Sequence, residues 1–164
     1  PLSPTLKDGY NLYLNAQLRK ISTGQGKLKG LIKWKETKSI LLKNEIITIN
    51  GETQEVPLSL ILNFIDADDK LYEYQIGEHC ISESMAYLIE NTLYKDVLPK
   101  PADFPYNTVN VICDYLAPNL SQAPLKVIAL CDACLMHSFP ALALYNGLMS
   151  LNNKYSILSQ ELNL

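Results

Sequence analysis

The longest run of apolar residues in the chain lies between positions 125 and 151. It reads LKVIALCDACLMHSFPALALYNGLMSL, and its apolar residues recur at helical spacing on more than one face. Proline is tolerated in the first turn of a helix but not in its middle, so we expect a break near Ser138-Phe139-Pro140. The pattern predicts a buried helix pair, opened by Ser121 or Gln122 and ended at Leu151–Asn153, around which the other elements pack.

The first half of the chain alternates between apolar and polar residues, as strands with one buried face do. The predicted strands cover residues 10–18, 27–35, 40–49, 53–65 and 71–76. Residues 36–38 are expected to turn the chain, and Asn50-Gly51 is a strong signal for a hairpin. Pro57 cannot donate a hydrogen bond to a neighbouring strand, so it should lie at an edge or a bulge.

Helical signals replace this alternation after Gly77. Ser82 is a good N-cap for a helix that continues through Leu93, and Asn107 is expected to cap a second helix that Pro118 stops. Residues 155–162 are predicted as a short final helix.

The sequence therefore predicts an α+β fold. An N-terminal antiparallel meander of about five strands, twisted or partly closed, should pack on a C-terminal group of four to five helices. We expect residues 1–164 to form a single domain, with a β-rich half at about 10–77 and a helical half at about 82–162, because the junction at 77–82 holds few linker residues.

The charge of the chain is divided unevenly. The formal net charge is −3, but residues 1–50 carry nine Lys or Arg against three acidic residues, and the remainder carries five Lys against fourteen Asp or Glu. Such a division favours attraction between the two halves, between copies of the chain, or to separate partners.

The chain shows no pattern of a secretory signal, so a cytoplasmic location is expected. Asp132, His137, Pro140 and Asn146 lie inside the longest apolar run and would each be costly in hydrocarbon. The residues therefore predict no association with a membrane.

Four cysteines are present, and Cys131 and Cys134 form a CxxC pair with His137 one further turn along. These three residues are candidate metal ligands, with His79, Cys80 or Cys113 as a possible fourth, but a structural zinc site usually has a second compact pair and none exists here. A redox or nucleophilic role is a further alternative. The favoured interpretation is that the cysteines are small buried hydrophobes, and no metal or cofactor is predicted.

Two other features have conservative interpretations. Asp132, in an apolar setting, should be paired, capped or placed at an opening. Asp66, Asp68 and Asp69 resemble the start of a calcium loop, but Leu71 and Gly77 occupy the positions where that loop needs Gly and Glu. A solvated hairpin turn is therefore predicted at 66–69.

The most distinctive surface feature is a row of lysines. Strand alternation over 27–35 would place four lysines on one face and Trp34 on the other, with two more lysines close behind; the predicted binding residues are Lys27, Lys29, Lys33, Lys35 and Lys38. The plain alternative is a solvated face on which lysines protect a strand edge. Because an inward Trp34 offers bases no stacking platform, a protein partner is favoured over nucleic acid.

Three functions remain open from the sequence. The leading hypothesis is a non-enzymatic protein-binding module, of the adaptor, inhibitor, immunity or phage and viral assembly kind, that binds an acidic protein or a second copy through this basic surface. The first alternative is nucleic-acid binding through the strand at 27–35. The second is an enzyme or metal protein that uses Cys131, Cys134 and His137.

Overall fold

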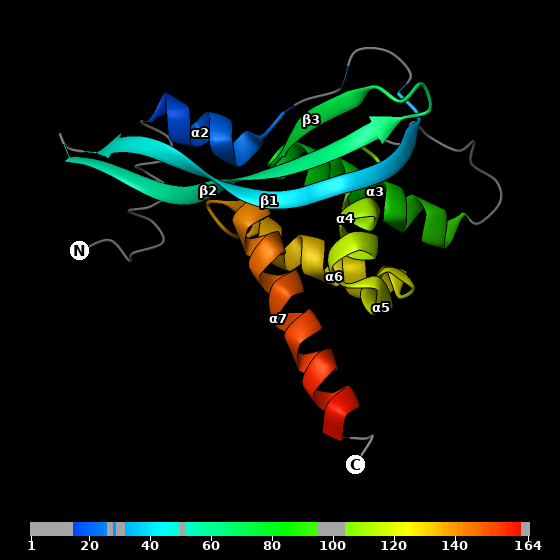
Figure 1. Cartoon of the computed structure of the whole chain (residues 1–164). Coiled ribbons are helices and arrows are strands. Elements are labelled where there is room, and N and C mark those ends of the chain that lie inside the picture. Colours follow the sequence, from blue (N-terminus) through cyan, green and yellow to red (C-terminus); the bar gives the residue numbers. More distant parts are fainter. Residues whose placement is uncertain (1–14, 26–27, 29–31, 50–51, 95–103, 162–164) are drawn as a thin grey trace.

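The computed structural model describes residues 15–25, 28, 32–49, 52–94 and 104–161 and shows an α+β protein (Figure 1). Its antiparallel sheet has the order β1-β2-β3 and consists of β1 (Trp34–Ile49), β2 (Glu52–Asp66) and β3 (Leu71–Ile76). Among the described residues, one helix precedes the sheet, α2 (Ala16–Thr23). Five follow it: α3 (Glu78–Leu93), α4 (Thr108–Leu116), α5 (Pro118–Ser121), α6 (Pro124–Leu135) and α7 (Pro140–Glu161).

The sheet lies between helix α2 and the C-terminal helices. Helices α4 to α7 lie below it in Figure 1, and α2 lies across the sheet from α6 and α7. Successive residues of a strand point to opposite faces, so Leu60 and Leu62 pack into the main core with the C-terminal helices while Ile61 faces the other way. Ile61 is also buried, together with Leu18 and Ile21 of α2. The central strand is therefore covered on both faces.

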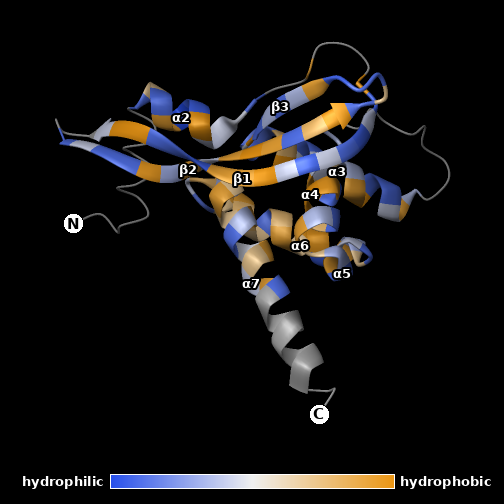
Figure 2. Cartoon of the chain, in the orientation of Figure 1, coloured by the Kyte–Doolittle hydropathy of each residue, from blue (hydrophilic) through white to orange (hydrophobic). Residues whose placement is uncertain are grey.

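The main core joins the sheet to the helices. One continuous hydrophobic cluster includes residues of β2, β3 and each of the helices α3 to α7. Figure 2 shows hydrophobic residues gathered in the middle of β1 and β2 and on the helices beneath them. Within the described residues, no helix is long and apolar enough to cross a membrane.

The described part of the chain has three strands, not the five predicted from alternation. Residues 10–14 lie outside the described residues, and the rest of the first predicted strand is the start of α2. Asn15 caps this helix, because its Oδ1 accepts hydrogen bonds from the main-chain N–H groups of Gln17 at 3.0 Å and Leu18 at 3.1 Å. The cap and the helical spacing of Leu18 and Ile21 outweigh the period-two pattern.

The predicted strand at 27–35 is wrong at the described residues 28, 32 and 33, because β1 begins only at Trp34. Residues 27 and 29–31 lie outside the described residues. Leu28, Ile32 and Trp34 do pack against the main core, as their alternation predicts. The predicted turn at 36–38 is wrong because β1 runs through these residues.

The long hairpin is confirmed. β1 and β2 pair in antiparallel register from Ile49 opposite Glu52 back to Trp34 opposite Asp66, and they flank Asn50-Gly51, which lies outside the described residues. Pro57 lies at a register shift, in a part of β2 beyond the residues that pair with β3. The edge-or-bulge prediction for this proline is therefore confirmed. The short strand at 71–76 matches β3.

The long apolar run forms a helix pair, as predicted, but the prediction that most of this run is buried is wrong, since Leu125 is 69% and Met136 80% exposed. The ends of the two helices are also corrected. α6 stops at Leu135 and α7 begins at Pro140, so the break lies where proline placed it. The first helix opens at Pro124 rather than at Ser121 or Gln122. α7 continues past the predicted stop at Leu151–Asn153 and includes residues 155–161 of the predicted separate final helix, whose last residue, 162, lies outside the described residues.

The earlier helices follow their sequence signals in part. α4 begins after Asn107 and ends before Pro118, as predicted, but the side chain of Asn107 makes no capping hydrogen bond and accepts from Asn110 Nδ2 at 2.9 Å instead. α3 begins at Glu78, one residue after Gly77, so Ser82 is an interior residue and not the N-cap. The hydroxyl of Ser82 donates instead to the main-chain carbonyl of His79 at 2.9 Å, a bond within the helix.

Candidate binding surface on strand β1

The lysines predicted to bind a partner are placed along the start of β1. Lys27 and Lys29 lie outside the described residues. Lys33 immediately precedes β1, and Lys35 and Lys38 belong to it; all three are exposed. Lys43, further along the same strand, is exposed as well.

Two of these lysines occupy β-bulges. The register moves from Trp34 opposite Asp66 to Glu36 opposite Ile65, which leaves Lys35 as an extra residue in β1. A second shift between Thr37 and Ser39 leaves Lys38 as an extra residue in the same way. A bulge changes the direction of a side chain and increases the local twist. The lysines therefore do not form the even row that strict alternation predicts.

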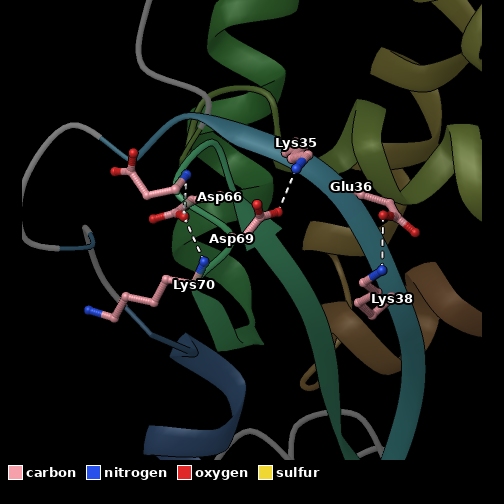
Figure 3. A network of polar contacts seen from close by, with 7 residues as sticks. Lys35, Glu36, Lys38, Asp66, Asp69 and Lys70 are labelled. Atoms are coloured by element: carbon pink, nitrogen blue, oxygen red, sulfur yellow. Dashed lines mark hydrogen bonds and ion pairs between the residues drawn. The ribbon is translucent and has the colours of Figure 1, made fainter.

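Each bulge lysine has a carboxylate partner (Figure 3). Lys35 forms an ion pair with Asp69, in the turn between β2 and β3, and Lys38 pairs with Glu36 at 2.9 Å. The hydrogen bond and the charge of Asp69 raise the pKa of Lys35, so this amine stays protonated at neutral pH. Among the described residues, no ion pair involves Lys33 or Lys43. Exposed pairs of this kind are weak, so a partner's carboxylates can replace them at small cost.

The turn at 66–69 is built by hydrogen bonds within it. Asp66 Oδ1 accepts from the main-chain N–H of Asp68 at 2.9 Å and of Lys70 at 3.0 Å (Figure 3). The Lys70 N–H contributes most to lowering the pKa of Asp66, which remains ionised. Asp69 has a φ of 60°, a conformation that Asp and Asn tolerate better than most residues. The predicted hairpin turn is confirmed, and it holds Asp69 beside Lys35.

Trp34 lies at the inner side of this surface. Its side chain is half-buried and packs against the main core, on the face of β1 that is covered by the helices. A base stacking on this surface would therefore have no free indole face beside Lys33 and Lys35.

The cysteines lie elsewhere, inside the helical layer. All four are buried free thiols, carried by α3, α4 and α6: Cys80, Cys113, Cys131 and Cys134. Burial is the largest cause of the raised pKa in each, to about 12 for Cys80, Cys113 and Cys131 and to about 11 for Cys134. These thiols are protonated at neutral pH and so are poor nucleophiles.

The candidate metal ligands are not brought together. Cys131 and Cys134 face the core, whereas His137 follows the end of α6 and is exposed. Within the described residues, no group of three or more His, Cys, Asp or Glu side chains is arranged to hold a metal ion. Asp132 is exposed on α6, and this exposure satisfies the requirement that its charge should not be buried alone.

We expect the buried thiols to make stability depend on alkaline pH. Their folded pKa values lie above the ordinary value of 9.0, so the folded chain keeps protons that the unfolded chain loses. The stabilisation is complete below about pH 9 and decreases as pH rises toward about 12, by up to about 1.4 kcal/mol per pH unit for each thiol. Urea titrations between neutral pH and pH 10 measure this slope.

The matched control for this prediction is Cys80→Ala. The variant should be less stable at neutral pH, because it leaves a small cavity, but its stability should decrease less steeply above pH 9. Equal slopes for the variant and the wild type would show that Cys80 ionises as readily in the folded chain as in the unfolded one.

The residues that complete this surface were not found from the sequence. Asp69 is thirty-four positions from Lys35, and their contact follows from the β1–β2 register. Tyr115 of α4 reaches the same strand, with its hydroxyl 3.5 Å from the carbonyl oxygen of Lys38.

Comparisons of the chain with family models, curated proteins and solved structures gave no match.

Proposed function

We propose that the chain is a non-enzymatic protein-binding module that binds an acidic partner protein through β1. The observation that carries the proposal is the set of exposed amines along one strand: Lys33, Lys35, Lys38 and Lys43. Clustered positive charge accelerates association with an acidic surface and selects against basic ones. Adaptors, inhibitors, immunity proteins and assembly factors of phages and viruses are the classes that fit this mode of action.

The geometry favours a protein partner over nucleic acid. Trp34, the only tryptophan of the chain, packs against the core instead of lying open beside the lysines. Glu36 and Asp69 lie among the amines and would repel a continuous phosphate backbone. A protein surface can place its carboxylates at the lysines and avoid these two acids.

The direct test is capture from the native source with three baits. These are the wild type, Lys33→Glu, and Lys126→Glu, which changes the net charge equally at an exposed position of α6. We expect an acidic protein that is retained after nuclease treatment by the wild type and by Lys126→Glu, and severalfold less by Lys33→Glu. Retention of nucleic acid that depends on Lys33 would replace the proposal with the nucleic-acid alternative.

We also predict that removing an internal carboxylate strengthens partner binding. Asp69→Asn frees Lys35 for the partner and keeps a residue type that tolerates the φ of 60° at this position. Affinity for the captured protein should rise about twofold, the scale of an exposed ion pair, as measured by calorimetry at low salt.

Asp68→Asn is the control for this prediction, because it makes the same change in net charge and Asp68 forms no ion pair with another described residue. It should change affinity less than Asp69→Asn. If the two variants bind equally well, Lys35 does not contact the partner, and the effect of Asp69 is one of overall charge alone.

A further inference from the structure

Within the described residues, the outer edge of β1 is unpaired in its middle. β1 is the first strand of the sheet, and its only partner strand in this part of the chain is β2, so half of its main-chain groups point away from the sheet. The direction of these groups is fixed by two contacts from α2: Gln17 Nε2 donates to the carbonyl of Ile46 at 2.8 Å, and Asn15 Nδ2 to that of Thr48 at 3.4 Å. The main-chain N–H and C=O groups of the even-numbered residues therefore point away from β2 in this part of β1.

The same parity extends back along the strand. Every residue of β1 from Ser39 to Ile49 has a partner in β2, and the extra residue at the Lys43/Asn44 shift belongs to β2. The main-chain groups of Ile40, Leu42 and Asn44 therefore also point outward. In the described part of the chain, no hydrogen bond outside the sheet uses them.

The free edge is limited at both ends. The side chains of α2 cover the carbonyls of Ile46 and Thr48, and Tyr115 of α4 approaches the carbonyl of Lys38. The open stretch is thus 39–44. The two bulges of β1, at Lys35 and Lys38, lie before this stretch, and the shift at Lys43/Asn44 adds its extra residue to β2 and not to β1. Its exposed side chains include Leu41, which is 40% exposed, and Lys43, while the Lys38 bulge lies at the other end.

We propose that this edge receives an extended acidic segment of the partner protein as an added antiparallel or parallel strand. The inference rests on the proposed function and specifies how the partner binds. Main-chain hydrogen bonds to Ile40, Leu42 and Asn44 supply affinity, and side chains beside Leu41 and the two flanking lysines supply selectivity. A segment with an apolar residue between carboxylates fits this order of side chains.

The edge favours such a segment over a second copy of the chain. Antiparallel pairing of two copies about Leu41 would bring Ile46 of one copy against the bulged start of β1 in the other, with α2 attached near Ile46. It would also gather the lysines of both copies in one short stretch of sheet. A short acidic segment brings neither the extra helix nor the like charges.

The experiment uses the full chain and a blocked-end peptide in which glutamate and valine alternate. We expect the peptide to slow amide hydrogen exchange at Ile40, Leu42 and Asn44 in the wild-type chain. A second peptide with the same side chains carries an N-methyl group on every residue, which removes the donors along both of its edges while keeping its charge. It should not give this protection.

A pair of variants tests the same edge from the side of the protein. Asn44→Pro removes one outward N–H without removing a bond to β2, and Asn44→Ala loses only the side-chain contact with Glu55. Asn44→Pro should weaken peptide binding about fivefold to tenfold relative to Asn44→Ala, the effect of one main-chain hydrogen bond. Circular dichroism of both variants establishes that they are folded.

The outcomes separate this inference from the proposed function. Binding that needs Lys33 but is equal for both peptides would overturn strand addition and leave a basic surface that attracts acidic proteins by charge. Protection of the same three amides by increasing protein concentration alone would identify a second copy as the occupant and overturn the proposal. No protection by the peptide at millimolar concentration would also overturn it.

Discussion

Gly77→Ala should destabilise the protein by about 3 kcal/mol, the upper end of the usual range for overpacking, because two glycines place their backbones in contact where α2 approaches α3. A Cβ built on Gly24 would lie 2.5 Å from the main-chain nitrogen of Gly77, and one on Gly77 would overlap the backbone of Thr23 and Gly24. Neither clash can be relieved by rotating a side chain. Chemical denaturation measures the loss, and we expect amide protection in α2 to be lost first.

Gly147→Ala is the control for this substitution. Gly147 lies inside α7, and its added Cβ would meet only Leu130 Cδ1, at 3.2 Å, the end of a flexible side chain. Alanine also favours the helix by about 0.5–1 kcal/mol over glycine, so this variant should be close to neutral or slightly stabilised. A Gly77→Ala protein as stable as Gly147→Ala would mean that α2 does not dock at Gly77 in solution.

Phe64→Ala should cost about 3–5 kcal/mol, the range for removing a buried aromatic side chain. Phe64 is fully buried in β2, and its ring stacks on Phe104 at 4.3 Å and on Tyr72 at 5.3 Å between centroids. It thus connects the sheet to the segment that leads into α4. The free energy of unfolding in urea measures the effect.

Leu71→Ala provides the comparison for Phe64→Ala. Leu71 begins β3 and is exposed, so its truncation should change stability by no more than about 0.5 kcal/mol. A small loss for Phe64→Ala, similar to that for Leu71→Ala, would contradict the shared core of sheet and helices.

Local signals predicted the elements that depend on local physics. The Asn50-Gly51 pair between β-rich runs located the long hairpin, and the alternation of Tyr72, Tyr74 and Ile76 located β3. Pro140 located the break in the helix pair, because the missing N–H of proline is tolerated only in the first turn of a helix.

The remaining elements depend on contacts that one sequence does not display. Residues 15–23 contain both a period-two pattern and a capped helix, and the capping hydrogen bonds of Asn15 together with burial of Leu18 and Ile21 decide between them. The bulges at Lys35 and Lys38 have no glycine or proline to mark them. They arise from the pairing of β1 with a partner strand whose register is set elsewhere.

The candidate surface was predicted in composition but not in geometry. Strand parity placed Trp34 inward correctly, because that residue begins β1. The ion pair between Lys35 and Asp69 joins residues that are distant along the chain, so the sequence alone does not show it. The unpaired edge at residues 40–44 is likewise set by which strands pair in the sheet. Strand addition therefore depends on the unpaired edge of the sheet and not on the lysines alone.

Hydrogen exchange of the full chain, alone and in complex with the protein captured from its native source, tests the central proposal most directly. We predict slower exchange at the outward amides of Ile40, Leu42 and Asn44 and little change on the exposed faces of α6 and α7. Protection confined to the helices, with the amides of β1 exchanging as in the free chain, would contradict the proposal that this strand binds the partner.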